Sequence, residues 1–404
     1  MPDQLSDGGG AGPAPGTAAT GATPAGPGAT APPLGSPTSA PARRRLDPRL
    51  RAFLVSLVVL AVGAALGTGG FFVEQSRATW RPQVTAAGSG WRISTSHGQR
   101  LGGAALGGDK LVWNAGAFTL LTDLATGRTR LLGAAALAGN ASAPAASDRY
   151  AVWMEMQQGA RTGTIVWAYD MGNGRRTRLT GAAGVDRSPA VAGSTAVWAT
   201  ELAGGQEWLV HGVDLASGRA LRLARTPVAD DLTGGGTLAA WVSRRTTVTA
   251  PPVITVADLG GDLRRQVAPY VDAQSGRLIG FALAGRSLLW ARAGGGANDQ
   301  IVAFDVDTGA TRVVASAPGV RALAAAGDLL VWAEGAPAGG GRVMGLRLGT
   351  GAPYVGTQSG DSPFVIAEVS GGTITDVYAG TGTAAWRVRG ALFFDSYLQT
   401  AGVR

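Results

Sequence analysis

Few side chains of this chain could carry acid, base or metal chemistry. Its 404 residues include no cysteine and two histidines, His97 and His211. The lack of cysteine excludes disulfides, thiolate nucleophiles and cysteine-ligated metals. The two histidines are not spaced as a pair of zinc or iron ligands. We expect both histidines to have structural roles.

Two acidic stretches could bind a cation or supply paired carboxylates. The run from Asp305 to Gly309 begins like a calcium loop but lacks the later ligand positions, so a hairpin turn is the favoured interpretation. Asp230 and Asp231 have no partner acid, base or metal ligand in the sequence, and we interpret them as a solvated pair in a connection. No Gly-x-Ser-x-Gly motif is present. The sequence therefore predicts no catalytic residue, no metal site and no cofactor, and a protein that is not an enzyme.

The positive charge of the chain does not point to nucleic acid. The formal net charge is +8, but Lys110 is the only lysine and the arginines are scattered over the whole sequence. A nucleic-acid surface would require basic residues concentrated on one face or element. We therefore expect no nucleic-acid partner.

The elements that must position these residues recur along the chain. From Gly90 onward, four short apolar stretches joined by turns repeat with a period in the forties. The third stretch commonly ends in Asp with Gly four residues later, as at Asp214 and Gly218, because Asp caps a tight turn and Gly supplies the positive φ that closes it. This repeat predicts an all-β chain folded as a β-propeller of four-stranded blades. The second stretch ends each time in a tryptophan that we expect to pack between blades: Trp113, Trp153, Trp198, Trp241, Trp290, Trp332 and Trp386.

The tryptophan series predicts seven blades, with six or eight as alternatives because the segment 354–380 is irregular. The last repeat, which begins near Thr373, lacks a fourth strand. An alternating segment near Trp91 precedes the first repeat and has no partner of its own. Open sheet edges are a liability, so we expect the residues around Trp91 to complete the last blade.

A hydrophobic segment precedes the repeats. Residues 52–70 carry no charge and follow an arginine cluster; as a helix they would extend roughly 28 Å, close to the ~30 Å core of a bilayer. Basic residues before the helix predict a cytoplasmic N-terminus and an exported propeller; a cleaved signal peptide is the alternative. The expected organisation is a disordered cytoplasmic tail (1–51), a transmembrane helix or signal anchor (52–72), a linker (73–89) and the propeller (90–404).

Several repeats resemble those of the TolB-like propeller proteins. The resemblance rests on Pro-Ala-Val at 189–191, Ala-Val-Trp at 196–198, and the segments 165–170 and 176–180. That repeat style usually forms six blades, so a seventh would depart from it. The Asp-x-x-Thr-Gly turns at Asp123 and Asp305 are similar to quinoprotein repeats. The TolB-like resemblance implies an envelope-associated interaction module and carries over no catalytic residue.

The lengths of the connections predict a binding face. First-to-second and third-to-fourth connections are short, whereas second-to-third and blade-to-blade connections, such as 224–233 and 354–371, vary in length. The variable classes emerge on one face, where loops on a rigid scaffold commonly bind partners. We expect a membrane-anchored, exported scaffold with a protein or envelope-component partner; the alternatives are a quinoprotein-like or other propeller enzyme and a sensor module. The candidate contacts are Arg161, Glu207, Asp231, Arg244, Arg245 and Asp272.

Overall fold

The computed structural model describes most of the chain from residue 82 onward. The predicted tail and transmembrane helix and most of the linker lie outside the described residues. Within the described residues, no helix is long and apolar enough to cross a membrane. The described ranges are 82–95, 101–116, 118–134, 143–157, 163–181, 185–203, 205–244, 253–261, 263–267, 278–293, 298–335, 340–348, 362–390 and 396–403.

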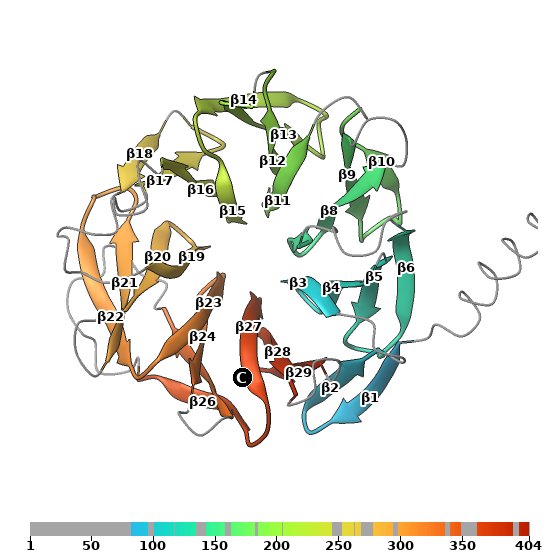
Figure 1. Ribbon diagram of the computed structural model, residues 1–404, viewed down its shortest axis with the longest axis vertical. Coiled ribbons are helices and arrows are strands. Elements are labelled where there is room, and N and C mark those ends of the chain that lie inside the picture. Colours follow the sequence, from blue (N-terminus) through green and yellow to red (C-terminus); the bar gives the residue numbers. More distant parts are fainter. Residues whose placement is uncertain are drawn as a thin grey trace, which may run out of the picture. The chain divides into compact units, whose positions relative to one another are not determined.

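Seven antiparallel sheets form a ring, so the predicted seven-bladed β-propeller is confirmed (Figure 1). In every blade the first strand lies nearest the central axis. Blades 1 to 3 comprise β3 (Leu101–Gly107), β4 (Lys110–Ala115), β5 (Phe118–Asp123) and β6 (Thr129–Ala134); β7 (Ala145–Ala146), β8 (Tyr150–Gln157), β9 (Gly163–Asp170) and β10 (Arg176–Arg178); β11 (Asp186–Ala192), β12 (Thr195–Glu201), β13 (Trp208–Asp214) and β14 (Ala220–Thr226). Blades 4 to 6 comprise β15 (Asp230–Gly235), β16 (Leu238–Arg244), β17 (Val253–Asp258) and β18 (Arg264–Val267); β19 (Leu278–Ala284), β20 (Ser287–Arg292), β21 (Asp299–Asp305) and β22 (Thr311–Ala317); β23 (Val320–Ala326), β24 (Leu329–Gly335), β25 (Gly341–Arg347) and β26 (Phe364–Val369).

The seventh blade joins the two ends of the propeller. It contains β27 (Thr373–Gly380), β28 (Thr383–Arg389) and β29 (Ser396–Gly402), followed by β2 (Gly90–Ser94) and β1 (Gln83–Ala87). Because β2 pairs with β29, with Ile93 opposite Leu398, the predicted closure by the residues around Trp91 is confirmed. The predicted linker was too long: residues 83–87 form a fifth strand paired with β2.

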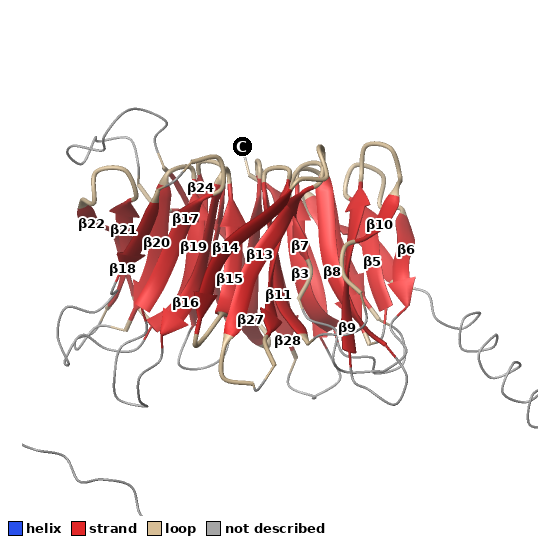
Figure 2. Ribbon diagram, turned by 90° about the horizontal axis from the view of Figure 1, so that it is seen from above, coloured by secondary structure: helices blue, strands red, loops and turns tan. Residues whose placement is uncertain are grey.

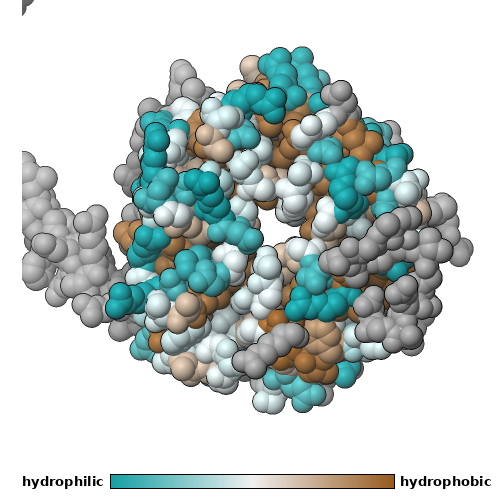
Figure 3. All heavy atoms as spheres, turned by 180° about the vertical axis from the view of Figure 1, so that it is seen from behind, coloured by the Kyte–Doolittle hydropathy of each residue, from teal (hydrophilic) through white to brown (hydrophobic). Residues whose placement is uncertain are grey.

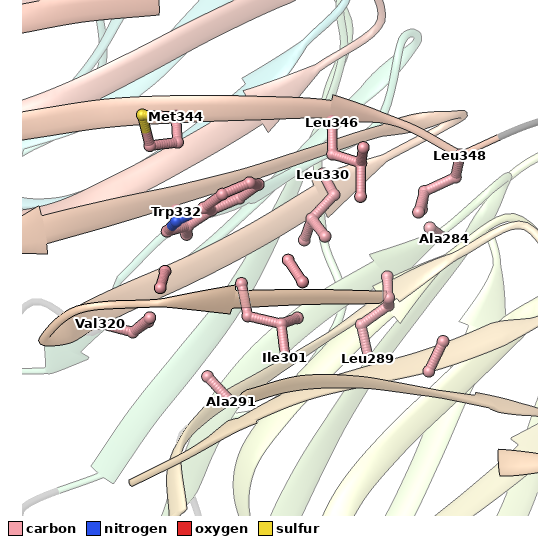
Figure 4. Close-up of a cluster of buried hydrophobic side chains, with 13 residues drawn as sticks. Ala284, Leu289, Ala291, Ile301, Val320, Leu330, Trp332, Met344, Leu346 and Leu348 are labelled. Carbon is pink, nitrogen blue, oxygen red and sulfur yellow. The ribbon is translucent and has the colours of Figure 1, made fainter. Parts of the chain in front are cut away.

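The seven predicted tryptophans are the main contacts between blades. Each is at most 3% exposed. Trp332 of blade 6, for example, packs with Leu289 and Ile301 of blade 5 (Figure 4). The same relation recurs around the ring: every tryptophan lies in a cluster with apolar residues of the preceding blade. A large ring at this position fills the gap between splayed sheets, so the predicted inter-blade role is confirmed.

Short turns gather on one face of the ring, which is the upper edge in Figure 2. The predicted Asp caps are present: Asp123 Oδ1, for example, accepts hydrogen bonds from the backbone N–H groups of Ala125 (3.0 Å) and Thr126 (3.1 Å). Gly127, Gly174, Gly218 and Gly309 close four of these turns with positive φ. We call this surface the tight-turn face, and the opposite surface, where second-to-third and blade-to-blade connections begin and end, the loop face.

Two predicted connections were wrong. The blade-to-blade connection predicted at 224–233 is confined to 227–229, since β14 continues to Thr226 and β15 begins at Asp230. The one predicted at 354–371 is confined to 370–372, because residues 364–369 form the fourth strand of blade 6. The segment between β25 and β26 is therefore a third-to-fourth connection, which starts and ends on the tight-turn face. The sequence did not reveal β26 because its repeat lacks a tight turn before this strand.

Candidate functional site

The inner strands share an irregularity where they begin, at the mouth of the central channel on the loop face. A shift in pairing register occurs near the start of six inner strands, and β7, the seventh, has only two residues. Such β-bulges redirect side chains and are common beside functional sites. The shifts fall between Leu101 and Ala104, Arg187 and Ala190, Asp230 and Thr233, Leu278 and Gly280, Val320 and Ala322, and Ile374 and Asp376.

Two of these bulges hold strained residues. Ser188 has φ of 50° and Asp231 has φ of 52°, and they are the only non-glycine residues with positive φ in the described part of the chain. Each comes directly after the residue at which pairing is interrupted, in neighbouring blades 3 and 4. This conformation costs most non-glycine residues, serine among them, roughly 1–2 kcal/mol, and it costs aspartate less because its short side chain can hydrogen-bond locally. Strain of this kind accumulates at ligand-binding sites.

Charged side chains from several blades surround the same mouth. Arg187, next to Ser188, is exposed, and its guanidinium carbon lies 4.7 Å from the ring centre of Trp208. Arg321, in the bulge of β23, is also exposed; it packs against Gly335 at a point where a β-carbon would clash. These contacts hold two cations at the rim, with the exposed Asp231 on the same face.

The bulge of blade 7 is bound to blade 1 by an arginine. Arg387 forms an ion pair with Asp376, and its Nε donates a hydrogen bond of 3.0 Å to Thr375 Oγ1. Its Nη1 donates to the carbonyl oxygens of Leu101 and Gly102, both at 2.9 Å. The bulge in β27 is therefore bound to the bulge in β3 at the rim.

A hydrogen-bonded group of three polar side chains lies beneath the rim in blade 3. Thr200 Oγ1 donates to Asp186 Oδ1 at 2.5 Å and lies 2.6 Å from His211 Nε2. The His211 ring is tilted at 53° against Trp198, with ring centres 4.5 Å apart. With Asp186 ionised, the hydroxyl proton of Thr200 is directed at the carboxylate and not at the imidazole, the reverse of the arrangement that activates a hydroxyl nucleophile.

Burial controls the ionisation of Asp186 and His211 in this group. It raises the pKa of Asp186, an effect that the hydrogen bond from Thr200 opposes. Burial, together with the charge of Arg222, lowers the pKa of His211 to about 4. His211 is therefore neutral at physiological pH and donates to Thr200 when its Nε2 carries the proton. The network anchors the start of β11, just before the strained Ser188.

The predicted contacts are only partly placed by the structure. Glu207, just before β13, forms an ion pair of 2.8 Å with Arg225. Asp231 was expected in a connection but lies in the bulge of β15, and its neighbour Asp230 begins that strand. Arg244 ends β16. These three residues belong to the loop face. The other three, Arg161, Arg245 and Asp272, lie outside the described residues.

Sequence reasoning missed Arg187, Ser188 and Arg321 because a bulge depends on the register between two strands. One signal was available. Pro189 lies within an apolar strand, and proline lacks the N–H that a regular ladder requires, so it marks a bulge or an edge.

On the tight-turn face, several charges pair within the protein, as those of Arg387 with Asp376 and of Arg225 with Glu207 do on the loop face. Lys110 pairs with Asp123 (2.9 Å), Arg149 with Asp170 (2.9 Å), and Arg347 with Asp328 (2.9 Å). The hydrogen bond from Lys110 lowers the pKa of Asp123, and that from Arg149 lowers the pKa of Asp170. Figure 3, which views this side of the ring, shows hydrophilic residues spread around the central opening. Many of these charges are thus already paired within the protein.

Metal-ligating residues do not cluster in the described part of the chain: no group of three or more His, Cys, Asp or Glu side chains there could hold an ion.

Comparison with known proteins shows the fold and no more. No family model matches the chain, and no curated protein matches it. Among solved structures, oligogalacturonate lyase from Vibrio parahaemolyticus is 10% identical with a TM-score of 0.54, covering 81% of this chain and 97% of the lyase. The WD40 repeats of RRP9 are 10% identical with a TM-score of 0.50, covering 80% and 100%. TolB from Acinetobacter baumannii is 14% identical with a TM-score of 0.38, covering 55% of this chain and 58% of TolB, so the match spans little more than half of TolB.

Proposed function

We propose that this protein is a membrane-anchored, exported propeller that binds a protein or another envelope component over its loop face. The observation that carries the proposal is the paired strain at Ser188 and Asp231. Neither residue is required to be non-glycine by the fold, because glycine adopts positive φ without a steric cost. Serine and aspartate at these positions supply polar atoms at the rim, which glycine would not.

Exposed charged side chains at the channel mouth support the same face. On the tight-turn face, acidic side chains cap turns and pair with neighbouring cations, as Asp258 does with Arg286 at 2.5 Å. On the loop face, the exposed side chains of Arg187, Asp231 and Arg321 surround the channel mouth. Rigid elements that present a few polar groups around a concave centre suit binding.

Photocrosslinking tests the face and captures whichever partner binds there. A photoreactive amino acid is placed at Arg321, on the rim, or at Arg128, beside a tight turn and also exposed, in the full-length chain in its native membrane. The proposal expects a discrete crosslinked product from position 321 and none from position 128, identified by mass spectrometry. A product formed only from position 128 would assign binding to the opposite face.

A further inference from the structure

A second surface lies on the outer wall of the ring, between blades 3 and 4. Two adjoining hollows of about 440 and 490 Å³ meet there and share Arg222, Leu223 and Arg264 as lining residues. Both hollows lie along β14, the last strand of its sheet. Within the described residues, no strand pairs with the outer edge of β14, so its backbone polar groups on that side are available.

The hollows exist because blade 4 has a short outer strand. β14 has seven residues, whereas β18, the outer strand of the next blade, has four. Leu221 and Leu223 face this junction and pack with the Trp241 cluster. The shorter neighbour leaves the edge of β14 uncovered, with an apolar floor beneath it.

Arginines flank this edge on both sides. A register shift at Val210/His211 gives β14 an extra residue, Leu223, so that Arg222 and Arg225 lie on the same face, opposite His211 and Leu209. Arg264 of β18 pairs with Ala257, a member of the cluster between blades 3 and 4, and so it lies on the other side of the edge. All three arginines are exposed.

Most of this positive charge is not neutralised within the described residues. Arg225 pairs with Glu207 at 2.8 Å, but no ion pair is formed there by Arg222, Arg264 or Arg219, which also lines one hollow. The one carboxylate that lines the hollows, Asp258, is held by Arg286 at 2.5 Å. Arginine binds carboxylates through charge-assisted and often bidentate hydrogen bonds, so these side chains can receive an acidic ligand.

We infer that the outer edge of β14 binds an acidic segment of a partner protein in an extended conformation. The segment adds a strand to blade 3 through backbone hydrogen bonds. Its carboxylates alternate between the two sides, where they meet Arg222 on one side and Arg264 on the other. A free strand edge distinguishes a peptide from a lipid surface, because a headgroup has no use for a row of backbone donors and acceptors. This site lies along the outer edge of β14 and reaches the loop face at Arg225. It does not depend on the function proposed above.

The test uses the purified full-length protein and labelled peptides as long as β14, seven residues. One peptide repeats the pattern Glu-Glu-Val-Val, so that its carboxylates project to both sides of the extended chain. A second has the same sequence with N-methylated backbone amides along one edge, which prevents strand pairing. Binding is measured by fluorescence anisotropy. Arg222→Glu and Arg264→Glu should each raise Kd about tenfold or more. Arg128→Glu is the matched control, since it makes the same change of charge on blade 1 at an exposed residue.

The inference is supported if the first peptide binds, the N-methylated peptide does not, and only the two groove variants weaken binding. Equal weakening by Arg128→Glu would reduce the effect to net charge and overturn the inference. Equal binding of the N-methylated peptide would overturn strand addition. Vesicles with anionic headgroups provide a third arm: if they bind in an Arg222-dependent manner while the peptide does not, the occupant is a membrane and the inference is wrong.

Discussion

Ser188 and Asp231 occupy equivalent places in neighbouring blades, each just after the last regular pair before a bulge and each with positive φ, 50° and 52°. An unfavourable conformation therefore recurs in two of the seven blades, at the same rim of the channel. It connects the backbone geometry of the inner strands to the binding proposed for the loop face.

Closure of the ring by β1 and β2 should contribute strongly to the stability of the propeller. A chain that begins at residue 98 lacks β1 and β2, which exposes the edge of β29 and removes Ile93, a fully buried side chain. Loss of the Ile93 side chain alone should cost about 2–5 kcal/mol. The chain that begins at residue 98 should therefore melt well below one that begins at residue 82, or aggregate, as measured by calorimetry. Equal melting temperatures would contradict the pairing of β2 with β29.

The seven tryptophans should not contribute equally to the stability of the protein. Trp113 and Trp241 are both fully buried, but Trp113 Nε1 donates to Thr122 Oγ1 at 2.9 Å, whereas Trp241 Nε1 has no partner within the described residues. Both replacements by phenylalanine create a similar cavity, but Trp113→Phe also removes a buried hydrogen bond. It should be less stable than Trp241→Phe by about 1 kcal/mol in urea unfolding. The opposite order would show that relaxation of the cavity outweighs the hydrogen bond.

The tryptophan series and the Asp caps show how far the sequence determines the fold. Both are local signals, because Asp123 caps its own turn and the second strand of every blade contains one tryptophan of the series. The tryptophans lie within these strands and not at their ends, where the sequence had placed them. Closure could also be predicted, since an unpaired strand at each end requires a partner. The bulges at Ser188 and Asp231 could not, because register depends on the neighbouring strand. The charge pairs could not be predicted from the sequence either, since Arg286 joins Asp258 and Asp307 from two blades.

The hydrogen-bonded group of Asp186, Thr200 and His211 in blade 3 should make the free energy of unfolding depend on pH. The pKa of His211 is about 4 in the folded protein and about 6.5 when unfolded. The stability contributed by neutral His211 is therefore complete above about pH 6.5 and is lost as the pH falls toward about 4. Asp186 acts in the opposite direction: its pKa is raised, so protonation relieves the cost of burying its charge as the pH falls.

His211→Gln separates the two effects, because glutamine keeps a donor for Thr200 but does not titrate. Between about pH 7 and pH 4, the wild type should lose about 2 kcal/mol more unfolding free energy than the variant, after allowance for solvent screening at this half-buried site. Urea titrations at both pH values measure the difference. Parallel losses in the two proteins would show that His211 does not contribute.

The orientation predicted from the arginine cluster can be tested with thiol labelling. The chain has no cysteine, so a cysteine introduced at Ser36 or at Ser316, which is exposed on β22, is the only thiol. With the N-terminus in the cytoplasm, an impermeant reagent added to intact cells should label position 316 and not position 36. Labelling of position 36 alone, or of both equally, would contradict an exported propeller.

The central claim is that strain at the channel mouth is retained for binding, and one double variant tests it most directly. Ser188→Gly with Asp231→Gly relieves both positive-φ residues and removes their polar side chains. Its unfolding free energy should be unchanged or higher by up to about 1 kcal/mol, because relief of strain is partly offset by the flexibility of glycine in the unfolded chain. With the photoreactive residue kept at Arg321, the crosslinked product should fall about tenfold or more. An undiminished product at equal or higher stability would contradict the account.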